Sequence, residues 1–424
     1  MSAHPTTAEL EELAVSALAG AAGETQATVV WQRVDGADDL AIELTTVIDG
    51  RAARARATGP DEASLGRAGH AAATNARRPR AWPTPGLPEP QEGRAHDGFD
   101  PAVLQDLGEP PAASGLEVTL SAGAARVAIA STLGVRASES RSWVTLTARG
   151  GTAEREVVVT ASAAGPTALP AELLLHDAHA LLCDGTVQEP LPAEELPVVL
   201  GHDAVATVLD HLRRAFGVDL DLGGSGPYAG RFGTRVAAAA VNLSDSPRHR
   251  STLQRSFDAE GIPRRPVPLI QDGVAHRRVH DTASAARAGV ASTGHATSAA
   301  ALSPLPEQLV LVGGGAESLE ELCGPVARGI YVPSFDARGE AAAGGTFVHD
   351  TRGALLIEDG RLTRPLADGP LVVDPAAVLA GVEALTMRQR TIALRGHTPG
   401  GPGAAVVPAL RCSAGGVRPA AITA

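Results

Sequence analysis

Closely spaced turn signals constrain the fold of this 424-residue chain more than any other feature of its sequence. In the second half they are DGV at 272–274, DTRG at 350–353, EDGR at 358–361 and DG at 368–369. Asp-Gly pairs between apolar runs are typical of hairpin turns, because both residues tolerate a left-handed backbone. We therefore predict a strand-rich second half, folded as a curved antiparallel sheet or a barrel-like core.

The first half mixes both kinds of periodicity. Apolar residues recur at helical spacing over Thr7 to Ala19, and a second helix is predicted over roughly 60–77. Alternating stretches on either side of Asp49-Gly50 and of Leu133-Gly134 predict two hairpins, and EREVVVTASA predicts a further strand. The expected fold class is α+β with two domains, an N-terminal α+β domain over 1–190 and a strand-rich, barrel-like domain over 191–424.

A proline-rich passage interrupts the first domain. Residues 79–111 carry eight prolines and show little periodicity. Because proline lacks an N–H donor and fixes its own backbone angle, regular structure is disfavoured over most of this length. We predict a long surface connection.

The charge pattern excludes several functions. Every basic residue is arginine, so a lysine Schiff base and a GxxxxGK[ST] phosphate loop are both impossible. The formal net charge of -12 provides no general basic field for nucleic acid. Aromatic residues are only 3% of the chain, so the core must consist largely of Val, Leu and Ile.

Cysteine usage and hydropathy indicate a reducing compartment. The three cysteines lie far apart and form neither a disulfide framework nor paired CxxC ligands; they are Cys183, Cys323 and Cys412. The first twenty residues lack the basic segment of a signal peptide, and no apolar run approaches the ~18 residues of a membrane span. We expect a cytoplasmic protein that does not bind membranes.

A helix is predicted over 203–216, with Asp203 as its N-cap and an apolar stripe on one face. It contains VLDHLRRAF at 208–216, where one histidine, His211, stands without a second histidine one turn later. On this helix His211 either edges a cavity or lies at the rim of the core. A further short helix is predicted after Ser318, which forms a capping box with Glu321.

From about residue 197 to 422 the order of motifs resembles the TldD/PmbA family, and more its PmbA (TldE) branch than its TldD branch. The residues that carry this resemblance are VVLGHDAVATVLDHL, SFDAEGIPRRPVPLIQDGV, TASAARAGVASTGHA, GGGAESLEELCGPVARGIYV, GGTFVHDTRGALLIEDGRLTRPL and VVPALR. The resemblance implies a two-domain subunit, a dimer that encloses a central cavity, and a link to zinc-dependent proteolysis of small, unfolded or modified peptides.

In TldD-type subunits the family's zinc helix reads HExxxH, and a later cysteine completes the site. On this chain His211 matches the first histidine, Leu212 the glutamate and Phe216 the second histidine. The cysteine position falls around Gly403 or Ala404, and not at Cys412. Leucine and phenylalanine have no atoms that bind zinc or activate water. The resemblance thus implies no catalytic residue and no metal in this chain, with zinc expected in a TldD-like partner subunit.

A substrate groove is the remaining expectation for the site. The residues predicted to line it are His211, Asp258, Glu260, Ser292, Thr293, His295 and Phe347. Ser292, Thr293 and His295 are so close in sequence that a groove-lining loop is favoured over a nucleophile–base pair. Asp258 and Glu260 are favoured as turn carboxylates that accept backbone or Arg264 hydrogen bonds.

Three functions stay open on these residues. The favoured one is a PmbA/TldE-like subunit that pairs with a TldD-like catalytic subunit as a heterodimer and shapes the peptide site. The second is a self-sufficient metallopeptidase with ligands drawn from His202, His211 and His295. The third is a homodimeric peptide-binding protein without a protease partner.

Overall fold

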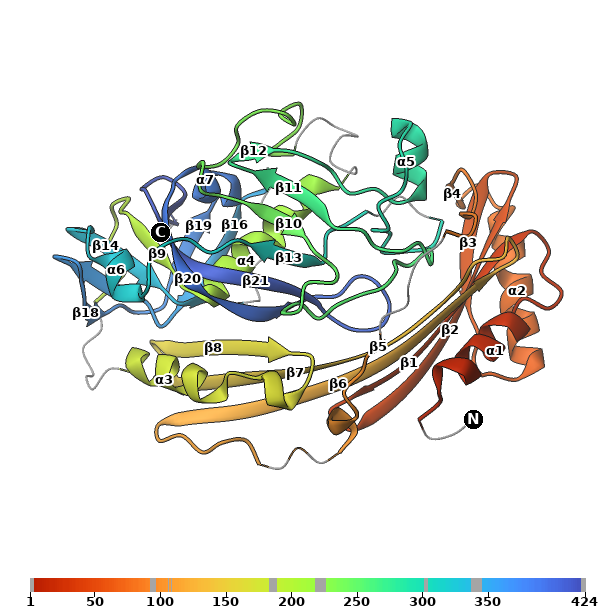
Figure 1. Ribbon diagram of the computed structural model, residues 1–424, viewed down its shortest axis with the longest axis horizontal. Coiled ribbons are helices and arrows are strands. Elements are labelled where there is room, and N and C mark those ends of the chain that lie inside the picture. Colours follow the sequence, from red (N-terminus) through yellow and green to blue (C-terminus); the bar gives the residue numbers. More distant parts are fainter. Residues whose placement is uncertain are drawn as a thin grey trace.

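The computed structural model describes residues 4–91, 97–105, 107, 109–182, 189–217, 226–300, 304–336 and 345–420. Their strands form three sheets. The strands of the first sheet lie between residues 24 and 163, and those of the other two between residues 198 and 419. The C-terminal half lies along one face of the long N-terminal sheet (Figure 1).

The N-terminal sheet is built from long antiparallel hairpins. Its order is β4-β3-β2-β1-β6-β7-β5, and β8 also pairs with β7. Asp49 and Gly50 both adopt positive φ, of 51° and 70°, in the tight turn between β2 and β3. Both predicted hairpins are confirmed, since β6 and β7 pair on either side of the Leu133-Gly134 turn. The strands are β1 (Glu24–Val34), β2 (Ala37–Ile48), β3 (Arg51–Arg56), β4 (Trp82–Pro83), β5 (Asp97–Gly98), β6 (Leu116–Ser131), β7 (Arg136–Gly151) and β8 (Glu156–Ala163).

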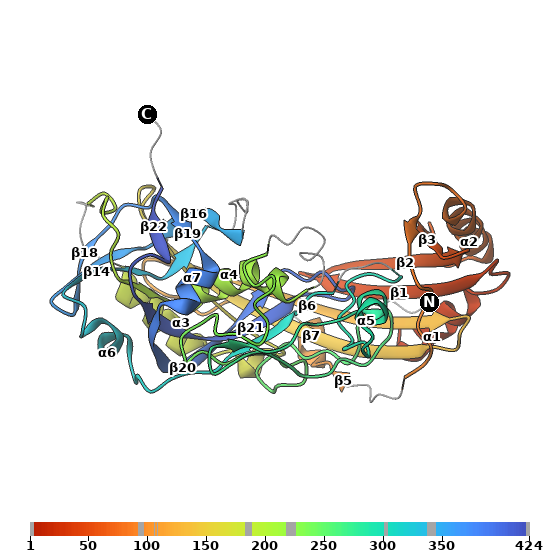
Figure 2. The same ribbon diagram turned by 90° about the horizontal axis from the view of Figure 1, so that it is seen from above.

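Strand β1 is buried on both faces of this sheet. On β1, Val29 and Trp31 pack in a cluster with residues of α1 (Thr7–Ser16) and α2 (Glu62–Ala76), which cover one end of the sheet. Val30 points to the other face and packs with Phe257 of the C-terminal half. Figure 2 shows α1 and α2 together at one end of the elongated molecule. Successive strand residues point to opposite faces, so both halves of the chain use the same strand.

Local capping signals explain where these two helices begin. The side chain of Thr6 accepts the N–H of Glu9, and that of Asp61 accepts the N–H of Ser64.

The proline-rich passage is mostly irregular in its described part, as predicted. Its regular elements there are β4, β5 and the 3-10 turn η1 (Pro101–Leu104).

The C-terminal half contains an open ten-stranded sheet. Its order is β12-β11-β10-β13-β21-β9-β14-β17-β18, with β20 also paired to β21. Among the described residues no pairing joins β12 to β18, so the barrel-like core predicted from the turns is not seen. The strands are β9 (Val198–Leu200), β10 (Leu243–Asp245), β11 (Val267–Gln271), β12 (Val274–Ala275), β13 (Gln308–Leu311), β14 (Arg328–Val332), β17 (Leu355–Glu358), β18 (Arg361–Pro365), β20 (Val382–Leu394) and β21 (Gly403–Cys412).

Two parallel pairs, β13 with β21 and β9 with β14, also depart from the predicted antiparallel sheet. Turn signals report only hairpins between neighbours in sequence, such as those at Asp272-Gly273 and Asp359-Gly360. Asp368 is not such a turn residue. Its carboxylate accepts the backbone N–H groups of Glu156 and Gly353, and therefore connects the two halves of the chain.

A four-stranded sheet completes the architecture, with the order β15-β16-β19-β22. Its strands are β15 (Ser334–Phe335), β16 (Phe347–Arg352), β19 (Pro370–Val373) and β22 (Val417–Pro419). The remaining helical elements are η2 (Pro166–Ala168), α3 (Ala171–Leu181), α4 (His202–Leu212), η3 (Arg213–Phe216), α5 (Thr282–Ala288), α6 (Leu319–Cys323) and α7 (Pro375–Ala380). In the described part of the chain, no helix has the length and apolar character needed to cross a membrane.

Two of the predicted caps need correction. Asp203 was predicted as the N-cap of α4, but α4 begins at His202 and its N-cap is Gly201. The carboxylate of Asp203 instead accepts the N–H of Thr160 on β8. Ser318 caps α6 as predicted, but the carboxylate of Glu321 accepts the N–H of Glu317, so the reciprocal half of the capping box is absent.

Cys323 and Cys412 are buried free thiols, and Cys183 lies outside the described residues.

Candidate functional site

A cavity of about 800 Å³ lies between the two halves of the chain. One wall is the edge strand β8, and the others come from α4, η3, the β15–β16 hairpin and the end of β20. The polar side chains that line it are Arg149, Glu156, Thr160, Asp203, Thr207, Asp210, His211, Arg213, Arg214, Ser334, Asp336, His349, Arg352, Arg395 and His397. The lining thus combines a strand edge with many charged groups.

His211 lines this cavity from the last turn of α4. Its Nε2 lies 3.1 Å from Nε2 of His349, and its ring stacks on Phe347 with 4.1 Å between the ring centroids. The two positions that the sequence left open for His211 are thereby distinguished, because its side chain edges a cavity.

Sequence reasoning missed His349, although a signal for it exists. β16 alternates strictly, with Phe347, His349 and Thr351 buried and the residues between them exposed. Phe347 was predicted to be a groove residue, and a period of two places His349 on the same face of that strand.

The two imidazoles form a neutral pair. Burial and, to a smaller extent, the neighbouring His349 lower the pKa of His211 to about 4. Burial also lowers the pKa of His349, although a hydrogen bond to the backbone of Asp336 acts in the opposite direction. At neutral pH one imidazole donates an N–H to the lone pair of the other. This end of the cavity therefore offers hydrogen bonds rather than a charge.

The positions of the family's zinc motif do not fit a zinc ion. Leu212 is only 2% exposed, and Phe216 is fully buried with its ring 5.5 Å from that of Tyr228. Both side chains belong to the main core of the C-terminal half. The chain tightens into the 3-10 turn η3 after Leu212, where the sequence predicted an unbroken helix. We therefore derive no metal-dependent step at these residues.

The alternative ligand set is dispersed. His211 lines the 800 Å³ cavity, whereas His202 lines a second cavity of about 360 Å³. His295 is fully buried elsewhere, with Nε2 3.2 Å from Oδ1 of Asp245. Within the described ranges, no three His, Cys, Asp or Glu side chains are grouped closely enough to hold a metal ion. Cys412 lies at the end of β21, where it pairs with Val198 of β9.

The predicted groove residues divide into two separate places. His211 lines the cavity and Phe347 is buried behind it with the two rings stacked, but the other five lie in the loops between β10 and β13, away from the cavity lining. Asp258 is fully buried and accepts the N–H groups of Glu260, Ile262 and Ala296. Irregular backbone needs such acceptors when it is buried, which explains the carboxylate.

The remaining groove candidates also serve the buried loops. Glu260 accepts the N–H and hydroxyl of Thr282 at the start of α5. Desolvation and the adjacent Asp258 raise the pKa of Glu260. The hydroxyl of Thr293 accepts the N–H of His280, and that of Ser292 donates to the carbonyl of the same residue. Of the two predicted donors to these carboxylates, the backbone N–H groups are confirmed, whereas the guanidinium of Arg264 pairs with Glu307 instead.

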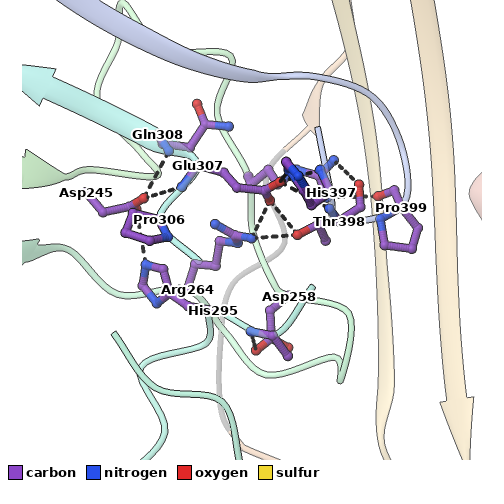
Figure 3. A network of polar contacts seen from close by, with 12 residues as sticks. Asp245, Asp258, Arg264, His295, Pro306, Glu307, Gln308, His397, Thr398 and Pro399 are labelled. Carbon is purple, nitrogen blue, oxygen red and sulfur yellow. Dashed lines mark hydrogen bonds and ion pairs between the residues drawn. The ribbon is translucent and has the colours of Figure 1, made fainter. Parts of the chain in front are cut away.

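A polar network holds the loop that follows β20. Glu307 pairs with Arg264 at 2.8 Å and accepts the N–H groups of His397 and Thr398, as Figure 3 shows. Arg255 donates to three carbonyls of the same loop, those of Thr398, Pro399 and Gly401. The loop 395–402 is consequently fixed by buried charges. It brings Arg395 and His397 to the cavity wall.

The C-terminal half of the chain is similar in sequence to a known protein family. The sequence model described as "PmbA/TldA metallopeptidase C-terminal domain" matches residues 193–417, more than half of the chain. The chain belongs to the TldD/PmbA metallopeptidase family. The resemblance recognised in the sequence is thus confirmed at the level of the family.

Two curated relatives cover part of this TldD/PmbA family member. A "Metalloprotease TldD homolog" of Haemophilus influenzae is 29% identical over 194 residues, or 43% of this chain and 38% of that protein. A "Metalloprotease" of Methanothermobacter thermautotrophicus is 26% identical over 190 residues, or 45% of this chain and 40% of that protein. The matches therefore span about two fifths of the relatives' length.

A solved structure is similar over nearly the whole chain. The crystal structure of TldE from Thermococcus kodakarensis superposes with a TM-score of 0.76 at 17% identity, covering 96% of this chain and 99% of that one. At this identity the similarity shows the fold. It confirms a mixed α+β architecture with several sheets for this family member.

Replacing Leu212 with glutamate is expected to create no zinc-dependent peptidase activity and to destabilise the protein by about 3 kcal/mol or more. The new carboxylate would enter the core, where Leu212 packs, and would not face His211 in the cavity. Urea unfolding and a peptide cleavage assay with added zinc test both statements. Cleavage that a chelator abolishes would contradict them.

Proposed function

We propose that this chain is the non-catalytic, PmbA/TldE-type subunit of a two-component zinc metallopeptidase that acts on small unfolded or modified peptides. The observation that carries the proposal is the contrast between Leu212 and Phe216, which are core residues, and His211, which lines a large cavity. This chain has a large cavity beside His211, but apolar side chains stand at two of the positions where the HExxxH motif has functional groups.

The proposed role of this subunit is to hold the peptide. β8 pairs with β7 along one edge, and its other edge faces the cavity through Val158 and Thr160. Along that edge, side chains substitute for a neighbouring strand: Ser334 donates to the carbonyl of Val158, and Asp203 accepts the N–H of Thr160. An extended peptide offers the same donors and acceptors and is suited to lie as an added strand.

In this proposal the partner supplies the zinc. A TldD-like subunit with an intact HExxxH helix would hold the metal, and this chain would bind none of its own. The two subunits would form a heterodimer around the peptide. The alternative of a homodimeric peptide-binding protein keeps the cavity but needs no partner, so complex formation separates the two.

Co-expression of the tagged chain with a TldD-like protein from the same genome tests the pairing. We expect the two proteins to co-purify and to give the mass of a 1:1 complex by light scattering. The matched control is a TldD-like subunit from an unrelated genome. Elution of this chain alone or as a homodimer, in the presence of excess partner, would refute the pairing.

A further inference from the structure

The arginines that line the 800 Å³ cavity differ in their partners. Three of the five form ion pairs with carboxylates: Arg149 with Glu156 at 2.5 Å, Arg213 with Asp210 at 2.7 Å and Arg352 with Asp336 at 2.6 Å. The other two, Arg214 and Arg395, are exposed, and neither pairs with a carboxylate among the residues that the structure describes.

Arg214 and Arg395 belong to segments that are joined side by side. Nη2 of Arg213 donates to the carbonyl of Arg395 at 2.9 Å and lies 3.4 Å from Nδ1 of His397. This contact ties η3 to the loop 395–402. The charge of Arg214 contributes to the lowered pKa of both His211 and His397, although burial is the larger cause for each. One wall of the cavity therefore carries positive charge beside the imidazole pair.

Two carboxylates in the segments that hold this wall, Asp210 and Glu307, already have partners. Asp210 pairs with Arg213, and the buried Glu307 pairs with Arg264 while it accepts hydrogen bonds from Thr398. The positive charge on the wall stands out because the chain as a whole has a formal net charge of -12. An anionic group on a ligand would be attracted to this wall.

We infer that Arg214 and Arg395 form a subsite for a carboxylate of the bound peptide, which is either its C-terminus or an acidic side chain. The inference rests on the proposed function, since it assumes that the cavity holds a peptide. Guanidinium groups bind carboxylates through paired, charge-assisted hydrogen bonds, and the neutral His211–His349 pair beside them supplies further hydrogen-bonding groups. Peptides that present a carboxylate at this end of the cavity are thus the preferred ligands.

Fluorescence anisotropy with labelled unstructured peptides of eight residues tests the subsite on the purified chain. Three peptides of one sequence are compared: a free C-terminal acid, its amide, and an amide with one glutamate added. We expect a carboxylate to tighten binding about tenfold, and R214Q/R395Q to remove that advantage while both variant and wild type remain folded. R287Q, an exposed arginine of α5 outside the cavity lining, is the matched control and should keep it.

The peptides separate the possible sources of the carboxylate. A gain for the acid alone assigns the subsite to the C-terminus, and a gain for the glutamate peptide assigns it to an acidic side chain. Equal binding of all three peptides, an advantage that survives in R214Q/R395Q, or no binding of any peptide would overturn the inference. Co-purification with the partner is measured separately, so the subsite can fail while the proposed pairing stands.

Discussion

Replacing Glu307 with alanine is expected to lower the free energy of unfolding by about 3 to 5 kcal/mol. Glu307 is fully buried, pairs with Arg264 at 2.8 Å, and accepts the N–H groups of His397 and Thr398. Its loss would leave a buried guanidinium and two loop N–H groups without their acceptor. A typical domain has only about 5 to 15 kcal/mol in total, so much of the stability would be lost.

Urea unfolding of three proteins, wild type, Glu307→Ala and Glu307→Gln, measures this effect. Glutamine keeps an acceptor for the loop but lacks the charge that Arg264 pairs with, so its loss of stability should be smaller than that of alanine. An alanine variant within about 1 kcal/mol of the wild type would contradict the assigned role of the network.

The buried side chain of His202 should lower the free energy of unfolding in acid. Burial lowers the pKa of His202 to about 3, and the nearby Arg390 and Arg388 act in the same direction. Because the unfolded chain binds the proton near pH 6.5 and the folded chain does not, the stability that His202 contributes is complete above pH 6.5. It is lost as the pH falls toward 3. Between pH 7 and pH 5 this loss amounts to about 2 kcal/mol.

The comparison of His202→Gln with the wild type isolates this effect. Burial raises the pKa of Asp203 and of Asp258 to about 6 each, and these groups gain stability over the same interval as the pH falls. Their contribution is common to both proteins and cancels in the difference. The unfolding free energy of the variant relative to the wild type should rise by about 2 kcal/mol from pH 7 to pH 5. A constant difference would contradict the assigned burial of His202.

Local features of the fold could be predicted from the sequence. The hairpin at Asp49-Gly50 and the starts of α1 and α2 depend on residues within a few positions of one another, so their signals are contiguous. The order of strands in the C-terminal sheet could not be predicted in this way, because it depends on residues far apart in sequence. β9 lies between β14 and β21, strands more than a hundred residues later in the chain, and no local turn records that placement.

The candidate site was only partly predictable for the same reason. His211 and Phe347 were identified from motifs, and the structure places their rings in contact. Glu307 was not identified, because its partners Arg264 and Thr398 are 43 and 91 residues away in sequence. Asp258 and Glu260 were predicted as turn carboxylates and also as possible groove residues, and His295 as part of a groove-lining loop. In this protein the two carboxylates accept buried backbone N–H groups, and Nε2 of His295 lies 3.2 Å from Oδ1 of the buried Asp245.

Zinc content and peptide cleavage, measured on the same samples, test the central proposal most directly. The chain purified alone and dialysed against a mild chelator should contain well under one zinc per chain and should leave unfolded peptides intact. Addition of a TldD-like partner should give zinc-dependent cleavage, and His211→Ala in this chain should leave most of that activity. Stoichiometric zinc in the isolated chain, together with cleavage that a stronger chelator abolishes, would contradict a non-catalytic role.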